Sequence, residues 1–146
     1  MNDLHDKIRT KTTVAPAAIG AAGPTTKTGL VVDRQGYGGV EFIAAYGAVT
    51  TTGTVCTLVV KEGDVTGTMT SVADADLIGT ELLASLLGAT TRTAGVSKEV
   101  TKRVGYRGVK RYVSCDVVTS VTSHATAGVG VTVLLHNAYN GITANP

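Results

Sequence analysis

Six basic residues crowd into one short stretch of the sequence and are the first candidates for chemistry. Glu99 is the only acidic residue near them before Asp116, and the six are Lys98, Lys102, Arg103, Arg107, Lys110 and Arg111. Tyr106 and Tyr112 lie between them, and cations interleaved with aromatic rings are typical of strand surfaces that bind nucleic acid. Two other interpretations stay open. The charge keeps an exposed strand soluble and unpaired, or it faces an acidic protein surface.

The remaining residues that could do chemistry do not gather into a catalytic set. The spacing of the three histidines predicts no metal site; they are His5, His124 and His136. The acidic residues near the middle of the chain lack the spacing of an EF-hand and suit turns and helix caps; they are Asp64, Asp74 and Asp76. We therefore predict no enzymatic activity, no metal and no cofactor.

Two glycine-rich stretches, GYGG at 36–39 and GYRG at 105–108, do not suit phosphate binding. Neither lies between a strand and a helix, which is the context of a phosphate cradle. We expect turns in which glycine permits a positive φ angle.

Composition favours strands over helices. The chain has 146 residues, of which 43% are hydrophobic but only 4% aromatic. Its core must therefore come mostly from Val, Leu, Ile and Ala, and β-branched side chains suit a pleated sheet. The 18 glycines indicate many turns between short strands. A net charge of +2 is too small to imply a polyanionic partner by itself.

The sequence also suggests where the protein resides. Residues 1–13 are polar and charged where a signal peptide would be apolar, and no apolar run is long enough to span a bilayer. We expect a protein made and kept in a reducing cytoplasm, or in a particle assembled there. Cys56 and Cys115 fit that view as two separate buried thiols, because neither has a CxxC partner.

Residues 1–27 differ in composition from the rest of the chain and predict an extended N-terminal arm. They mix charges, prolines and glycines without helical or strand periodicity, so the segment would order mainly on a partner. Such an arm should be removable without unfolding the body. The alternative is a frayed terminus, although a solvated tail has no need of the apolar anchors that are scattered here: Leu4, Ile8, Val14 and Ile19.

Residues 28–137 predict an all-β body, followed by an irregular C-terminal tail at 138–146. Alternating apolar residues indicate strands near 40–46 and 128–136, and an apolar run at 54–61 indicates a central strand. One or two helical turns are expected near 81–87. Residues 98–118 predict a two-stranded ribbon joined through the GYRG turn, with its second strand half exposed. The pattern favours an antiparallel β-sandwich or jelly-roll-like barrel with at most one short helix.

Several segments in order resemble a known family. They are MNDLHDKIRT, VVDRQGYGGVEFIAAYG, SVADADLIGTE, KRVGYRGVKRYV and GVTVLL. Together they are similar to small proteins encoded in the head-morphogenesis regions of tailed bacteriophages and prophages. The resemblance covers nearly the whole chain but rests on strand and turn signatures without catalytic residues. It implies a virion protein, and small β-rich head proteins of this type commonly act as decoration or cement proteins.

We therefore expect a capsid decoration protein, located on the capsid surface of a virion, that spans neighbouring capsomers. Its partner would be the major capsid protein of a tailed phage, with the protein bound as a homo-oligomer, a dimer or trimer. A head–tail connector or tail-tube component is the first alternative, and a nucleic-acid-binding β module is another. The expected contact residues come from the arm and the ribbon: Leu4, Lys7, Ile8, Arg9, Lys11, Arg103, Arg107, Lys110 and Arg111.

Overall fold

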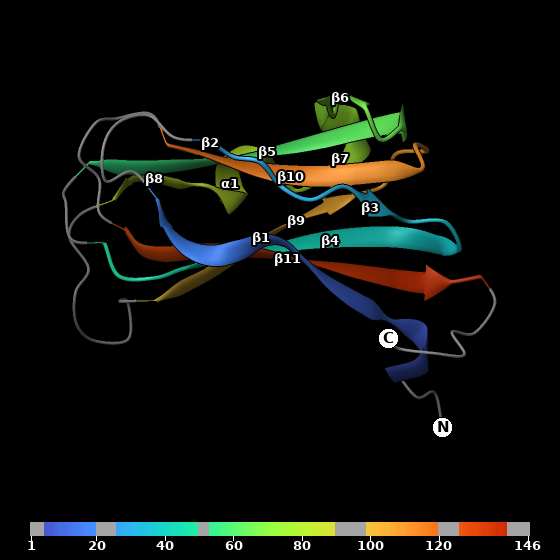
Figure 1. Ribbon diagram of the computed structural model, residues 1–146, viewed down its shortest axis with the longest axis horizontal. Coiled ribbons are helices and arrows are strands. Elements are labelled where there is room, and N and C mark those ends of the chain that lie inside the picture. Colours follow the sequence, from blue (N-terminus) through green and yellow to red (C-terminus); the bar gives the residue numbers. More distant parts are fainter. Residues whose placement is uncertain (1–4, 20–25, 50–52, 90–98, 120–125, 140–146) are drawn as a thin grey trace.

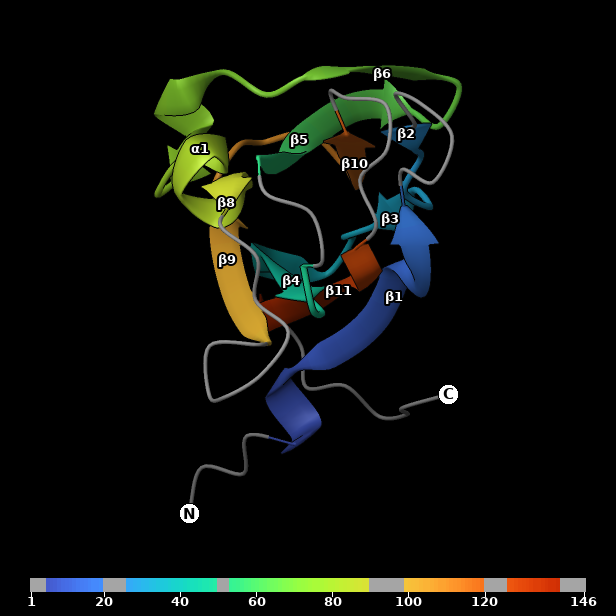
Figure 2. The ribbon, with the colours of Figure 1, turned by 90° about the vertical axis from the view of Figure 1, so that its left-hand side faces the viewer.

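The computed structural model describes residues 5–19, 26–49, 53–89, 99–119 and 126–139. Two antiparallel sheets lie face to face, as the predicted sandwich requires (Figures 1 and 2). The elements in chain order are η1 (His5–Lys7), β1 (Arg9–Ile19), β2 (Thr26–Lys27), β3 (Val32–Asp33), β4 (Tyr37–Tyr46), β5 (Thr54–Val65), β6 (Thr68–Ser71), η2 (Asp74–Asp76), β7 (Leu77–Ile78), α1 (Glu81–Ala84), β8 (Leu86–Ala89), β9 (Val100–Tyr106), β10 (Tyr112–Thr119) and β11 (Thr126–Ala138).

The first sheet has the strand order β1-β11-β4-β9-β7. The period-two pattern of β4 decides which side chains face inward, because successive side chains of a strand point to opposite faces. Phe42 pairs with Val133 of β11 and with Val104 of β9, and all three are buried. The opposite face of this sheet carries exposed residues such as Ala45 and Thr101.

The second sheet has the order β2-β10-β5-β6, with β3 also paired to β10 and β8 to β5. The apolar run at 54–61 lies within β5, which pairs with β10 along residues 56–63, as expected of a central strand. The strand β10 is more buried than predicted. Asp116 on its supposed exposed face is only 3% exposed, because it accepts a hydrogen bond from the Gly29 amide at 2.9 Å and pairs with Lys61 at 2.6 Å.

A single core of Val, Leu, Ile, Ala, Tyr and Phe side chains fills the space between the sheets. The edges of the sandwich approach each other at β1, where the Leu30 amide donates to the Thr13 carbonyl oxygen at 2.8 Å. On the opposite edge, β7 pairs with β9 and α1 lies against both β5 and β9. Among the residues described, no helix has the length and apolar character to cross a membrane.

The α1 turn confirms the short helix predicted near residues 81–87. Its N-cap is Thr80, whose side chain accepts a hydrogen bond from the Leu83 amide, instead of Asp74 or Asp76. The helix also covers β5, since the Val60 amide donates to the Glu81 carboxylate and the Leu58 amide donates to Ser85 Oγ. These two side chains accept hydrogen bonds from the stretch of β5 that lies between its pairing with β6 and its pairing with β8.

Residues 9–19 correct the expectation of an arm that ends at residue 27. They form β1, which pairs with β11 from Arg9 to Ile19, with Val14 and Ile19 buried in the core. The register shifts three times along this pairing, and Pro16 lies at one of the shifts. Bulges and proline are features of edge strands, and they hide the period-two pattern from a reading of the sequence. Leu4 and residues 20–25 lie outside the described residues.

Residues 98–118 correct a second expectation. They contain two strands, β9 and β10, but these lie in opposite sheets and do not pair with each other. The segment between them crosses the sandwich at Tyr106, which is completely buried. Gly108 is needed there for close approach, because a Cβ atom would lie 2.4 Å from the Tyr106 hydroxyl oxygen. A positive φ angle is found at Gly36 of the GYGG stretch, as predicted there.

Candidate protein-binding surface

The four basic residues predicted as ribbon contacts each have a partner within the chain. Arg111 donates to both carboxylate oxygens of Asp33, with Nη2 2.6 Å from Oδ2. Lys110 Nζ lies 2.5 Å from Asp64 Oδ2. These two ion pairs join the β9–β10 segment to the last residue of β3 and to the end of β5.

The other two cations lie elsewhere on the molecule. Arg103 points outward from β9, with its Nε 3.6 Å from Glu41 Oε1. Arg107 donates twice to the Ala75 carbonyl oxygen, at 2.8 and 3.0 Å. The predicted ribbon is therefore not a continuous patch of unpaired cations.

The Asp33–Arg111 pair has a marked electrostatic effect. Hydrogen bonds from Arg111 hold the pKa of the Asp33 carboxyl below its usual value, against the smaller opposing effect of burial. The Gln35 amide donates to the same carboxylate at 2.9 Å, and the charge of Lys11 acts in the same direction. Lys11, one of the predicted arm contacts, thus acts electrostatically on Asp33, the partner of Arg111.

The predicted arm contacts separate into two groups. Arg9 and Lys11 are part of β1, opposite Leu135 and Val133 of β11. Lys7 and Ile8 precede that strand and line a groove of about 640 Å³ beside the end of β11. The other residues that line this groove are Leu134, His136, Asn137, Ala138 and Tyr139.

A second groove, of about 250 Å³, also has Tyr139 in its lining. Its lining includes Val109 and Arg111 from the β9–β10 segment, together with residues 34–37. Tyr139 is therefore shared by a groove that contains arm residues and one that contains a ribbon residue. We call the two grooves together the Tyr139 surface, defined by Lys7, Ile8, Arg34, Val109, Arg111, Leu134, His136 and Tyr139.

The Tyr139 surface combines exposed apolar side chains with positive charge. Val109 is 88% exposed and Tyr139 is 75% exposed. The sequence pattern points to neither residue, because Val109 falls within the predicted ribbon and Tyr139 within the predicted irregular tail. Asn137 of β11, which has a φ angle of 56°, and the hydrogen bond from the Tyr139 amide to the Gly36 carbonyl oxygen set the course of the backbone at Tyr139. In Figure 1 the end of β11 and the start of β4 lie on the right.

Arg34 supports the base of this surface. Its Nε donates to the Lys110 carbonyl oxygen at 2.7 Å, and its guanidinium lies 5.2 Å from the centre of the Tyr106 ring. Its Nη1 is buried without a hydrogen-bond partner among the described residues. The ring of Tyr106 is fixed in turn, because its hydroxyl donates to Glu62 and accepts from the Lys110 amide.

The chemistry available at the Tyr139 surface suits contact with another protein. Aromatic side chains and arginine are enriched at protein interfaces. Across the described ranges, no group of three or more His, Cys, Asp or Glu residues could hold a metal ion. Cys56 and Cys115 are unpaired and buried, and burial raises the pKa of the Cys56 thiol to about 11.

Comparison with known proteins gives a fold but no family. No family model matches the chain, and no curated protein matches it. Among solved structures, the PBSX exported protein XepA is similar with a TM-score of 0.54 and 16% identity, over 94% of this chain. The chain spans only 40% of XepA. At this identity the likeness shows a shared sandwich fold.

Two further structures are less similar. VP2 in a subviral particle of infectious bursal disease virus has a TM-score of 0.49 and 13% identity, over 89% of this chain and 32% of VP2. A Bacillus endospore appendage protein of disulfide-linked pili has a TM-score of 0.43 and 14% identity, over 90% of both chains. Both scores are too low to support a functional argument.

Proposed function

We propose that this chain is a structural protein of a bacteriophage virion that decorates the assembled head and binds the major capsid protein through the Tyr139 surface. The observation that carries the proposal is that Tyr139 lines both the groove with Lys7 and Ile8 and the groove with Val109 and Arg111. Two segments that are distant in sequence thus supply one contact area. The resemblance of the sequence to phage head proteins supplies the partner, and the sandwich fold is compatible with it.

The charge distribution favours a protein partner over nucleic acid. Binding to phosphates depends on cations that can replace counterions, but Lys110 and Arg111 are already paired with Asp64 and Asp33. At the Tyr139 surface the Arg111–Asp33 pair lies beside the exposed Val109 and Tyr139 side chains. This combination suits a partly apolar patch on a capsid protein. The proposal includes no catalytic role.

Binding to purified heads tests the proposal. The heads should come from the phage that encodes the chain, prepared without this protein, and the occupancy of added protein should be measured by quantitative gel analysis and cryo-electron microscopy. We expect Val109→Ser combined with Tyr139→Ala to weaken binding at least tenfold, because both side chains are exposed and their loss should not disturb the fold. Val65→Ser is the matched control, since Val65 is 58% exposed at the β5–β6 turn.

The same experiment separates the alternatives. Hundreds of copies per head support a decoration protein, whereas about a dozen copies at one vertex would indicate a connector. Unchanged occupancy of the double variant would remove the Tyr139 surface from the proposal. Absence of wild-type protein from intact heads would reject the capsid role itself.

A further inference from the structure

Two glycines of the GYGG stretch lie next to side chains of the Tyr139 surface. A Cβ atom on Gly39 would lie 2.1 Å from His136 Cε1, 2.5 Å from Nε2 and 2.7 Å from Nδ1. A Cβ atom on Gly38 would lie 3.4 Å from the Tyr139 hydroxyl oxygen. Only the first set of distances is impossible for a real side chain. The lack of a side chain at residue 39 therefore gives the His136 imidazole its place.

The pairing of two strands explains how the His136 ring reaches Gly39. The two residues are directly opposite each other in the antiparallel pair of β11 and β4, and opposed positions of such a pair are close neighbours. Both lie on the outer face of the first sheet, because Val40 and Leu135 next to them are buried in the core. Gly39 is nevertheless buried. The His136 ring covers it.

His136 also lines the larger groove of the Tyr139 surface. This groove has a volume of about 640 Å³ and is shared with Lys7, Ile8 and Leu134. Because Gly39 lets the ring rest on the sheet, the ring forms part of the groove wall and does not fill the groove. A methyl group on residue 39 would take the place of the ring, which would then move away from the sheet and into the space of the groove.

We propose that Gly39 is a positioning residue of the capsid contact, which keeps the groove open by giving the His136 ring a place on the sheet. This inference rests on the proposed function and deepens it, since it identifies the groove beside Lys7 and Ile8 as the part whose shape decides binding. An apolar side chain of the capsid protein suits this groove, because its lining includes Ile8, Leu134, Ala138 and Tyr139. An open groove that needs no rearrangement lowers the cost of binding.

A side chain at residue 39 should not disrupt the fold. Gly39 has no positive φ angle, so the backbone there accepts any residue type except proline. The obstructing atoms belong to the far end of the His136 side chain, which is only half-buried and can rotate. Gly29 differs in this respect. A Cβ atom there would lie 2.1 Å from the Cys115 carbonyl oxygen, and no side-chain rotation relieves a clash with the backbone.

A double-mutant cycle on head binding tests the inference. Full-length variants are added to heads prepared without this protein, and occupancy is measured over a range of concentrations. We expect Gly39→Ala to weaken binding at least tenfold, because the displaced ring occupies the groove. In a His136→Ala background the same change should have less than a twofold effect, since no ring remains to be displaced. Equal losses in both backgrounds would mean that Gly39 acts without His136, and would overturn the inference.

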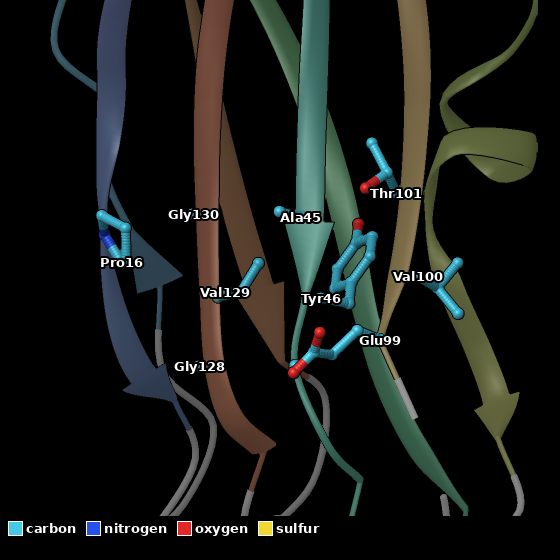
Figure 3. Close-up of a pocket in the computed structure, with 10 residues that line it drawn as sticks. Pro16, Ala45, Tyr46, Glu99, Val100, Thr101, Gly128, Val129 and Gly130 are labelled. Atoms are coloured by element: carbon cyan, nitrogen blue, oxygen red, sulfur yellow. The ribbon is translucent and has the colours of Figure 1, made fainter. Parts of the chain in front are cut away.

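Ala45→Val is the matched control, because it adds bulk to the same face of the same strand. Ala45 is exposed and lies about 20 Å along β4 from Gly39. It lines a separate hollow of about 320 Å³ together with Pro16, Thr101 and Gly130 (Figure 3). The added methyl groups have room there and should change head binding less than twofold. A loss as large as that of Gly39→Ala would overturn the inference, because binding would then depend on the whole outer face.

Chemical modification follows the ring without the use of heads. Diethyl pyrocarbonate acylates imidazole nitrogens, and those of His136 lie against Gly39 in the wild-type protein. We expect peptide mapping to show that His136 is modified at least threefold faster in Gly39→Ala than in wild type, with exposed His5 of the same protein as the reference. An unchanged rate would show that the ring does not move, which contradicts the inference.

These measurements separate a failure of this inference from a failure of the proposed function. If wild-type protein does not bind heads, the capsid role is rejected and the inference with it. If wild type binds and Gly39→Ala binds equally well, only the inference is rejected. Circular dichroism verifies that each variant is folded. His136→Trp enlarges the ring without changing β4, so it should weaken binding at least fivefold even if Gly39→Ala unfolds, and wild-type binding by this variant would overturn the inference.

Discussion

The β1 strand and the β9–β10 segment link the two sheets by different physical means. Strand β1 follows the edge of the first sheet, buries Val14 and Ile19, and reaches the second sheet through a backbone hydrogen bond from Leu30 to Thr13. The β9–β10 segment passes directly from one sheet to the other and is held by the polar contacts of Tyr106 and Arg111. The first link should depend mainly on apolar burial, and the second on hydrogen bonds and charge.

Removal of β1 should therefore have the largest effect. Deletion of residues 1–20, which a separate arm would tolerate, should prevent folding. The loss of Val14 and Ile19 alone costs about 3–6 kcal/mol, compared with the about 5–15 kcal/mol that stabilises a domain. We expect circular dichroism of the deletion protein to show no cooperative thermal unfolding.

A point substitution makes the same test milder. Val14→Ser should lower the free energy of unfolding by about 2–4 kcal/mol, because it removes a buried side chain and buries a hydroxyl. Ala15→Ser, at the exposed neighbouring position, should change it by less than about 0.5 kcal/mol. If the deletion protein unfolds cooperatively near the wild-type temperature, β1 is a dispensable arm after all.

The same two regions show how far the sequence can be interpreted. Alternation in residues 40–46 and 128–136 predicts β4 and β11 well, because regular pairing preserves a period of two. In β1 the three register shifts remove that period, so the strand is not evident without its partner β11. For residues 98–118 the strands are predictable but their sheets are not, since pairing depends on residues far away in the chain.

The candidate site was predictable in part for the same reason. Charge and apolar character point to Lys7, Ile8 and Arg111 as contact residues. Their neutralising partners and Tyr139 come from other turns, and only the folded chain brings these together. Asp33 is 78 positions from Arg111 in the sequence, a separation that no local pattern reveals.

The polar link should respond to a smaller chemical change. Tyr106→Phe keeps the buried ring but leaves the Glu62 carboxylate and the Lys110 amide without their shared hydroxyl partner. We expect chemical denaturation to show a loss of about 1.5–3 kcal/mol. Tyr112→Phe, which keeps the ring 5.0 Å from the Arg111 guanidinium, should change stability by less than about 0.5 kcal/mol. Equal effects of the two substitutions would mean that the Tyr106 hydroxyl does not hold the crossing.

The Asp33–Arg111 pair should have the smallest effect and a distinctive dependence on pH. Both side chains are more than a third exposed, at 38% and 48%, so solvent screening keeps the contribution of the pair small. Asp33→Asn removes the charge but keeps an oxygen that can accept from the Gln35 amide.

The sign of that pH dependence follows from the lowered pKa of Asp33 in the folded protein. The carboxylate stabilises the fold fully above its unfolded pKa of about 3.8, and this contribution disappears as the pH falls through the lower folded value. The difference in unfolding free energy between wild type and Asp33→Asn should thus be constant from pH 5 to 8 and shrink below pH 4. Glu41→Gln, whose partner Arg103 is 3.6 Å away and 78% exposed, should give a smaller difference at neutral pH. If Asp33→Asn and Glu41→Gln are equally mild at neutral pH, charge contributes nothing measurable to the crossing, and the Tyr106 hydroxyl contacts and apolar packing hold it.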